Sequence, residues 1–125
     1  ARIWDAHLSG PVLASDIDAV AVEVAQANVI ANDLTHSVTC LEAVGFDHPD
    51  LRAAPFDLVF ANILMGPLID LAPDMAQCVR AGGHAILSGL LVTQADAVLA
   101  AYTVQGFALE HREDIGEWAT LTLVR

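Results

Sequence analysis

The middle of the sequence contains the run Phe56-Asp57-Leu58-Val59-Phe60-Ala61-Asn62-Ile63-Leu64-Met65-Gly66-Pro67-Leu68. Its apolar part has the length of a β-strand, and it ends in the amide side chain of Asn62, shortly before a Gly-Pro break. A buried parallel strand that carries a polar side chain at its carboxyl end places that side chain where open α/β sheets hold ligands. Asn62 is therefore the first candidate for a functional residue.

Strand-like and helix-like segments also alternate before this run. Residues 12–15 and 37–41 have the composition of short strands, and Asp18 is a candidate N-cap for a helix between them that ends at Asn32-Asp33. The apolar face expected to be buried on this helix consists of Val20, Val24, Ala27 and Ala31. Residues 44–55 are expected to form a loop.

After the run, Pro67 suits the first turn of a helix that is expected to continue to a stop at Gly82-Gly83. The apolar stripe of this helix consists of Leu68, Leu71, Ala72, Met75 and Val79. Residues 84–88 predict a strand, and Thr93 with Asp96 resembles a capping box. The helix that follows is expected to end at Gly106 and to bury Ala95, Val98, Leu99 and Tyr102. Residues 107–112 and 118–124 predict an antiparallel hairpin.

This alternation predicts a single α/β sandwich with a mostly parallel sheet, a C-terminal hairpin and one antiparallel strand at the far edge. Right-handed connections place every strand-to-helix turn at the same rim of such a sheet. Asp16, the loop after Leu41, Asn62 and the Ser88-Gly89 turn are then expected to converge on one crevice. That convergence predicts a ligand site.

Length and composition exclude several classes of protein. A chain of 125 residues with 55% hydrophobic residues fits one compact domain, and no apolar run approaches the roughly 20 residues of a membrane span. The chain starts at Ala1 without a basic leader, so we expect a cytoplasmic location. Cys40 and Cys78 lie in apolar patterns and are expected to be reduced core thiols, and the five His residues lack the spacing of metal ligands.

The formal net charge of −11, with five Arg and no Lys, argues against a nucleic-acid backbone as the main partner. A basic protein partner suits this charge better. It is at least as plausible that the acidity only keeps the domain soluble.

Asp16 is the candidate for binding a ribose. A carboxylate at the end of a strand can accept hydrogen bonds from both ribose hydroxyls, although Asp16 is alternatively a turn or helix-capping residue. Because Asp18 already serves as a cap, we favour the ribose role. Ile17 is expected to lie against an adenosine face, or else in the core.

Asn62 is the candidate for holding an acceptor nitrogen. Its amide oxygen can accept a hydrogen bond from an amino group and keep the nitrogen lone pair directed at an electrophile. The alternative is an Asn that ends a strand by bonding its own backbone. The neighbouring Gly66-Pro67 break favours the functional interpretation.

Three segments in this order resemble class I S-adenosylmethionine-dependent methyltransferases: residues 14–25 followed by Asn28, residues 55–64, and Gly82-Gly83 before residues 86–89. Residues 66–73 and Gly116-Glu117-Trp118 add a resemblance to the ribosomal protein L-eleven methyltransferase family (PrmA type). The resemblance covers nearly the whole chain after Pro11.

The resemblance implies a Rossmann-like three-layer sandwich and methyl transfer from S-adenosylmethionine to lysine or α-amino groups of a large-subunit ribosomal protein. It implies that Asp16 and Ile17 bind the cofactor, that Val44 and Gly45 lie near adenine, and that Asn62 faces the acceptor nitrogen beside the cofactor. No metal-binding residue is expected, because the His and Cys residues lack the spacing of metal ligands.

The chain departs from the family because it contains no glycine-rich loop of the kind that lets the backbone approach the cofactor. We therefore expect residues 1–125 to be the C-terminal catalytic part of a longer protein, with the first strand of the sheet missing. A non-catalytic scaffold, or a fragment unable to bind cofactor, is the main alternative. A nicotinamide-dependent dehydrogenase is disfavoured, because it would need a Tyr or Lys proton donor in the crevice. The only tyrosine, Tyr102, is expected on a buried helix face, and there is no Lys.

Overall fold

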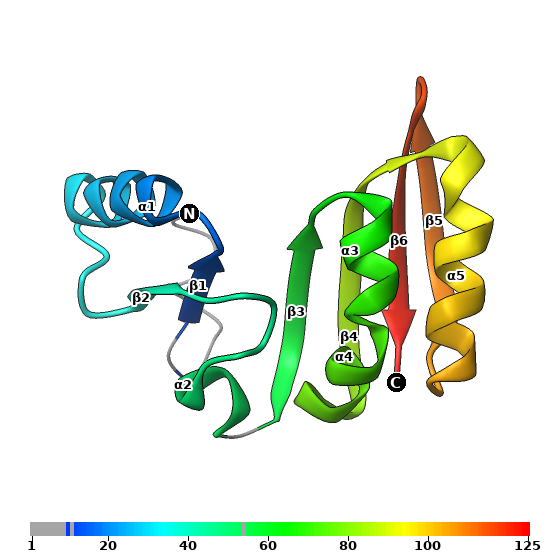
Figure 1. The fold of residues 1–125 in the computed structure, drawn as a ribbon, viewed down its shortest axis with the longest axis horizontal. Helices are drawn as coiled ribbons and strands as arrows, with labels where there is room; N and C mark the ends of the chain where they lie inside the picture. The colour runs from blue at the N-terminus through cyan, green and yellow to red at the C-terminus, as the bar shows by residue number, and fades with distance from the viewer. Residues whose placement is uncertain (1–9, 11, 54) are drawn as a thin grey trace. The chain divides into compact units, whose positions relative to one another are not determined.

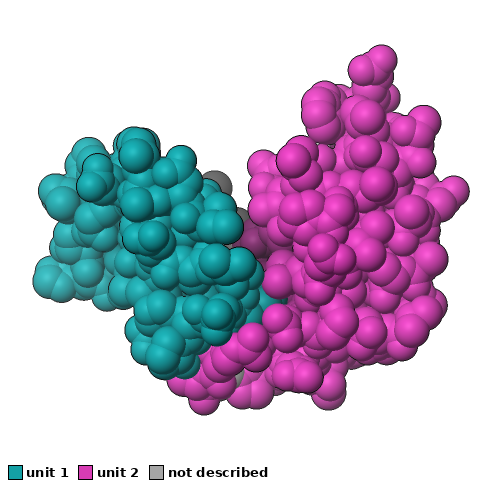
Figure 2. Space-filling model, viewed as in Figure 1, with its two compact units in different colours: residues 1–51 teal, residues 52–125 magenta. Residues whose placement is uncertain are grey.

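The computed structural model describes residues 10, 12–53 and 55–125. The chain divides into two compact units, Ala1–Leu51 and Arg52–Arg125, which Figure 2 shows in different colours. Each unit has its own β-sheet. The expected single catalytic domain over residues 1–125 stays a prediction.

The first unit is a βαβ motif (Figure 1). Strand β1 (Val12–Asp16) and strand β2 (Val38–Glu42) run parallel, in a register that joins Val12 to Val38 and Asp16 to Glu42. Helix α1 (Ala19–Ala31) connects them and packs on both. The predicted strands are therefore confirmed. The short helix α2 (Pro49–Arg52) lies inside the predicted 44–55 loop and spans the boundary between the two units.

Both predicted ends of α1 are confirmed. The Asp18 Oδ1 atom accepts a hydrogen bond from the backbone N–H of Val20 at 2.9 Å, which satisfies one of the free donors of the first turn. At the other end Asn32 is the C-cap, and Asp33 takes a left-handed φ of 56° that stops the helix.

The buried face of α1 differs from the predicted one. The predicted members are all exposed: Val20, Val24, Ala27 and Ala31. The residues that α1 does bury, fully or in part, are Ala21, Val22, Ala25, Gln26 and Val29. The prediction was wrong because this helix is apolar on almost every side, so the 3.6-residue period does not single out one face.

The second unit is built on a four-stranded sheet in the order β3-β4-β6-β5 (Figure 1). Its strands are β3 (Phe56–Asn62), β4 (Val79–Leu91), β5 (Ala108–Ile115) and β6 (Trp118–Val124). β3 is parallel to β4, whereas β6 is antiparallel to both β4 and β5. The connecting helices are α3 (Met65–Asp70), α4 (Ala72–Cys78), the 3-10 turn η1 (Val92–Gln94) and α5 (Ala95–Val104). The α/β class with an antiparallel C-terminal hairpin is confirmed.

Helices α3, α4 and α5 contact one another and so cover the same face of this sheet. Unit 52–125 by itself therefore has two layers, one of strands and one of helices. The third layer of the predicted sandwich is not formed within it.

The expected long helix after Pro67 is divided and ends early. Pro73 has no N–H to donate to the turn before it, so α3 and α4 separate at Leu71. The chain becomes strand at Val79, whose carbonyl accepts a hydrogen bond from the Arg125 guanidinium at 2.6 Å. Gly82-Gly83 lies inside β4, where the Gly82 N–H and the Gly83 carbonyl bond the backbone of Arg125. These tertiary partners replace the bonds of a further helical turn.

The start of α5 also differs from the prediction. Instead of a Thr93–Asp96 capping box, Gln94 Oε1 accepts a hydrogen bond from the Leu91 N–H at 3.0 Å. Asp96 lies 3.2 Å from the Arg112 guanidinium of β5, with which it forms an ion pair. The 3-10 turn moves the start of the helix past Thr93. The predicted end at Gly106 is confirmed, with a left-handed φ of 96°.

The antiparallel strand was predicted at the far edge of the sheet, and this prediction was wrong. The antiparallel strand is β6, which lies between β4 and β5. The reason is the distribution of apolar side chains. In β6, Ala119, Leu121 and Leu123 are at most 1% exposed, whereas seven of the eight β5 residues are exposed. Polar side chains suit the edge strand, where one row of backbone groups faces water. Gly116, with a φ of 59°, opens the two-residue turn between the hairpin strands.

The core of this unit joins the predicted helix stripe to the sheet. Its largest fully buried side chains are Tyr102, Leu68, Met75, Leu87, Leu90, Leu121, Leu123, Val79 and Val98. The Tyr102 hydroxyl donates a hydrogen bond to the Leu68 carbonyl at 3.0 Å, which ties α5 to α3. Burial raises the pKa of Tyr102 well above its ordinary value.

Replacing Tyr102 with Phe keeps the ring and removes this hydrogen bond. We expect the free energy of unfolding at pH 7 to fall by about 1 kcal/mol, as measured by urea denaturation. In the wild type the raised pKa of Tyr102 contributes stability below about pH 10, which is lost as the pH rises further, since only the unfolded chain then releases the proton readily.

The Phe variant has no such group, so the difference in the free energy of unfolding between the wild type and the variant should become smaller between pH 7 and pH 11. The chain has one Tyr and no Lys, which makes the comparison specific. A difference that stays constant over this range would contradict the assignment.

Candidate functional site

In the first unit, the carboxyl ends of β1 and β2 bring together four residues that the sequence singled out. The Ala43 N–H donates a hydrogen bond to the Asp16 carbonyl at 3.0 Å, so the loop after β2 begins beside Asp16. Ile17 and Val44 are 66% and 64% exposed, and Gly45 has a left-handed φ of 57°. These four residues therefore present one carboxylate and two apolar side chains to solvent.

The Asp16 carboxylate closes the turn between β1 and α1. Its Oδ1 atom accepts a hydrogen bond from the Asp18 N–H at 2.9 Å, so the alternative role of a turn residue is observed. Its Oδ2 atom has no hydrogen-bond partner among the residues that the structure describes. One carboxylate oxygen is therefore held in place while the other is free to accept a hydrogen bond from a ligand.

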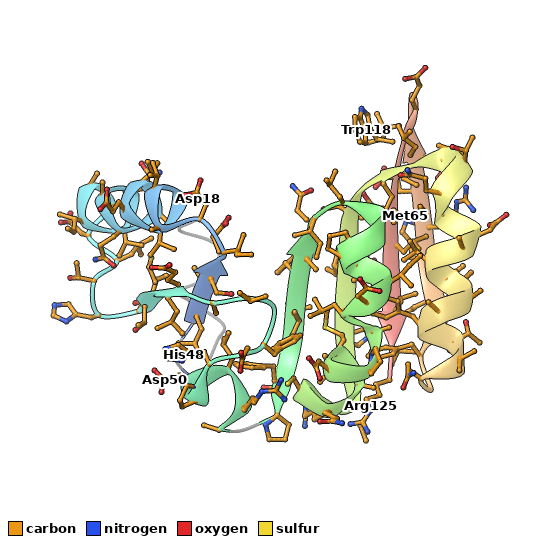
Figure 3. The ribbon with its side chains drawn as sticks, in the orientation of Figure 1. Asp18, His48, Asp50, Met65, Trp118 and Arg125 are labelled. Carbon is orange, nitrogen blue, oxygen red and sulfur yellow. The ribbon has the colours of Figure 1, made fainter. Side chains whose placement is uncertain are left out.

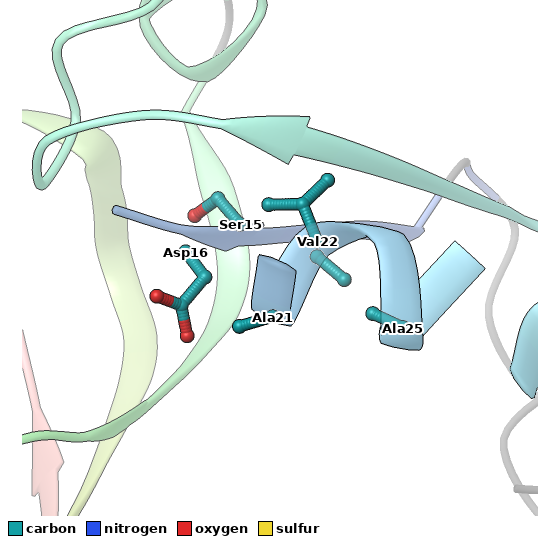
Figure 4. A pocket seen from close by; sticks show the side chains of 6 residues that line it. Ser15, Asp16, Ala21, Val22 and Ala25 are labelled. Atoms are coloured by element: carbon teal, nitrogen blue, oxygen red, sulfur yellow. The ribbon is translucent and has the colours of Figure 1, made fainter. Parts of the chain in front are cut away.

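A small hollow lies beside this carboxylate, between β1 and α1 (Figure 4). Its volume is about 100 Å³, and it is lined by Ala14, Ser15, Asp16, Ala21, Val22 and Ala25. Ligand pockets for drug-sized molecules start at roughly 300 Å³. The hollow by itself is thus too small for a nucleoside, which would have to lie over the exposed edge formed by Ile17 and Val44.

In the second unit, Asn62 ends strand β3, as predicted, and lies opposite Ser88 of β4. Its side chain is exposed and makes no hydrogen bond with any residue that the structure describes. The alternative of an Asn that bonds its own backbone is therefore not observed. Ile63 and Leu64, which follow, are 39% and 75% exposed, so the free amide is flanked by accessible apolar surface.

Ser88 and Gly89 are brought next to Asn62, but they do not form the turn that the sequence predicted. Strand β4 continues to Leu91, and the pairing of β4 with β6 shifts register between Leu87 and Leu90. Ser88-Gly89 is therefore a β-bulge inside the strand. An isolated Gly within a strand pattern is the sequence signal that indicates such a bulge.

A second hollow, of about 200 Å³, lies beyond the carboxyl end of β4 and was not predicted. It is lined by Leu91, Val92, Thr93 and Glu117. The Val92 N–H donates to the Glu117 carbonyl at 2.8 Å, which holds the hairpin turn against η1. Trp118 pairs with Leu91 and is 58% exposed near the tip of the hairpin (Figure 3).

The structure thus assembles two partial sites. Asp16, Ile17, Val44 and Gly45 share one edge of the first unit, and Asn62 with Ser88-Gly89 shares one edge of the second. Their convergence on a common crevice stays a prediction.

Neither cysteine has the environment of an activated nucleophile. Cys78 is buried and burial raises the pKa of its thiol, whereas Cys40 is half-buried in β2. Within the described ranges, no three His, Cys, Asp or Glu side chains are grouped closely enough to hold a metal ion. The helices of the described residues are all too short or too polar to cross a membrane.

The parallel strands with polar groups at their carboxyl ends define a Rossmann-like α/β fold. The crystal structure of ribosomal protein L11 methylase from Lactobacillus delbrueckii subsp. bulgaricus is similar, with a TM-score of 0.84 and 27% identity over 92% of this chain and 57% of that chain. Two curated relatives are both 49% identical to the present chain, over 107 and 124 residues. They are the ribosomal protein L11 methyltransferases from Brucella suis (strain ATCC 23445 / NCTC 10510) and Chelativorans sp. (strain BNC1).

The family model for ribosomal protein L11 methyltransferase (PrmA) matches residues 7–125. The chain therefore belongs to this family, which confirms the resemblance found in the sequence. The aligned regions cover 82% and 96% of the chain but only 38% and 41% of the two curated relatives.

Proposed function

We propose that the chain forms the catalytic domain of an S-adenosylmethionine-dependent methyltransferase that modifies lysine or α-amino groups of a large-subunit ribosomal protein. Family membership supports the reaction class. The observation that carries the proposal is the exposed Asn62 carboxamide, which lies at the carboxyl end of a parallel strand without a hydrogen-bond partner among the described residues.

In this proposal the edge of the first unit binds the adenosyl half of the cofactor. The free Oδ2 atom of Asp16 accepts hydrogen bonds from the ribose hydroxyls, while Oδ1 stays bonded to the Asp18 N–H. Ile17 and Val44 offer apolar surface for the adenine ring, and Gly45 leaves the loop backbone accessible. A hydrogen-bond acceptor beside two exposed apolar side chains is an arrangement that fits the ribose and the base of a nucleoside.

Asn62 would orient the acceptor. Its Oδ1 atom accepts a hydrogen bond from the neutral amine and directs the nitrogen lone pair away from the strand. When bound, S-adenosylmethionine supplies a methyl group on a sulfonium, which is transferred by in-line displacement. The chain then has to position the amine and exclude water, for which no nucleophilic Ser or Cys is required.

The charge of the chain supports a basic protein as the acceptor. A formal net charge of −11 attracts a cationic ribosomal protein and repels a nucleic-acid backbone. The proposal places the reaction in the cytoplasm, where ribosomal proteins are made.

Asp16→Asn should weaken cofactor binding by about 10-fold or more, because a charge-assisted hydrogen bond becomes a neutral one. Asn can still accept the bond from the Asp18 N–H, so the turn is retained. Isothermal titration with S-adenosylmethionine, on the protein encoded by the complete reading frame, measures the effect.

Asp33→Asn is the matched control for Asp16→Asn. It removes one charge from the same unit, and Asn tolerates the left-handed φ of 56° at this position. Equal losses in the two variants would mean that general charge, not a contact of Asp16, sets the affinity.

Asn62→Ala should lower kcat for methyl transfer to ribosomal protein L11 by about 100-fold, with the dissociation constant of S-adenosylmethionine nearly unchanged. Gln77→Ala, which removes an exposed carboxamide from α4, is the control and should leave both quantities unchanged. Equal losses of turnover and cofactor affinity in Asn62→Ala would assign this residue to cofactor binding or stability instead.

The 125-residue chain alone is expected to bind S-adenosylmethionine poorly or not at all, because it contains no glycine-rich loop. Calorimetric titration of this chain beside the protein from the complete reading frame tests this. Micromolar binding by the chain alone would show that such a loop is dispensable. Failure of both proteins to bind would favour the alternative of a non-catalytic scaffold.

A further inference from the structure

We propose that Gly89 is a positioning residue: its bare Cα, presented by the bulge of β4, sets the orientation of the Asn62 carboxamide. The inference rests on the proposed function, because it assigns a role to Gly89 through the acceptor-binding group of that site. No direct contact of Gly89 with a substrate is involved.

The bulge is what brings Gly89 to this place. Leu87 pairs with Leu121 and Leu90 pairs with Ala119, so Ser88 and Gly89 together lie opposite the single residue Thr120. On the other side of β4 the parallel pairing continues up to Asn62 and Ser88. The extra residue therefore lies beside the end of β3, and bulges at such places redirect the chain next to functional groups.

The space at Gly89 is limited mainly by Asn62. A Cβ atom built on Gly89 would lie 2.5 Å from the Asn62 Oδ1 atom, 3.2 Å from the Ile63 carbonyl oxygen and 3.4 Å from the Ile63 nitrogen. The first of these distances is much shorter than any van der Waals contact. The Asn62 side chain in its present orientation is thus compatible only with glycine at position 89.

This contact matters because little else holds the amide. The Asn62 side chain makes no hydrogen bond with the described part of the chain, so steric contacts limit its rotation. An Ala at position 89 would displace the Oδ1 atom more easily than it would displace the strand, because the amide is the end of a side chain. A shift of about 1 Å in a group that orients an acceptor can cost about 100-fold in rate.

Gly82 provides a matched control in the same strand. It has nearly the same left-handed φ, 80° against 79° at Gly89, but a Cβ atom built on it would have nothing within 4 Å. Gly82→Ala therefore introduces the backbone strain without the collision. Any difference between Gly82→Ala and Gly89→Ala reports the contact with Asn62 and Ile63.

The experiment compares Gly82→Ala, Gly89→Ala, Asn62→Ala and the double variant Gly89→Ala/Asn62→Ala in the protein from the complete reading frame. Methyl transfer from labelled S-adenosylmethionine to ribosomal protein L11 gives kcat, and calorimetry gives the cofactor dissociation constant. We expect Gly82→Ala to retain kcat and Gly89→Ala to lose about 100-fold, with cofactor affinity unchanged in both. The double variant should be no slower than Asn62→Ala, since the two changes act through one group.

Equal kcat in the two glycine variants, or losses that multiply in the double variant, would overturn the inference. If Gly89→Ala fails to fold, recovery of folding in the double variant supports the contact, and no recovery contradicts it. If the wild type transfers no methyl group, the proposed function fails. The contact between Gly89 and Asn62 can still be tested by the unfolding midpoints of the variants. Gly89→Ala should lower the midpoint less in the Asn62→Ala background than in the wild type.

Discussion

The parallel pairing of β3 with β4 is the constraint on which the rest of the second unit depends. β4 lies between β3 and β6, and its residues Ala85, Leu87 and Leu90 are fully buried. Its backbone groups must therefore bond to neighbours on both sides, because water does not reach them. The register that satisfies these bonds places Asn62 opposite Ser88. The position of the candidate acceptor group is thus a consequence of how the core strand is paired.

Polar groups in this protein divide into those used for the fold and those left free. The Tyr102 hydroxyl is fully buried and bonded to the Leu68 carbonyl, so it has no capacity for a ligand. Asn62, by contrast, ends a strand with its amide exposed and unbonded within the described residues. Asp16 does both, since one oxygen closes a turn and the other has no partner in the described part of the chain. Free polar groups at the carboxyl ends of parallel strands support the proposed site.

Sequence patterns failed where a pattern had more than one solution. The α1 helix is apolar almost all round, so Val20 and Val24 were predicted to be buried but are exposed. Val79 continues the apolar stripe of the helix predicted after Pro67, yet bonds to Arg125 and pairing with β3 make residues 79–83 strand. In the first case two faces of one helix were similarly apolar, and in the second the segment could be helix or strand; contacts with residues elsewhere in the fold decided both.

The sequence by itself determined the alternation of strands and helices, the cap at Asp18, the strand end at Asn62 and the family resemblance. These depend on local chemistry: side-chain periodicity, capping oxygens and residues that break regular structure. Only the tertiary structure decided that β6 lies inside the sheet, that Ser88-Gly89 is a bulge, and that Gly89 leaves room for the Asn62 amide. The physical reason is that strand order, register and close packing are set by burial and hydrogen bonding between segments far apart in the chain.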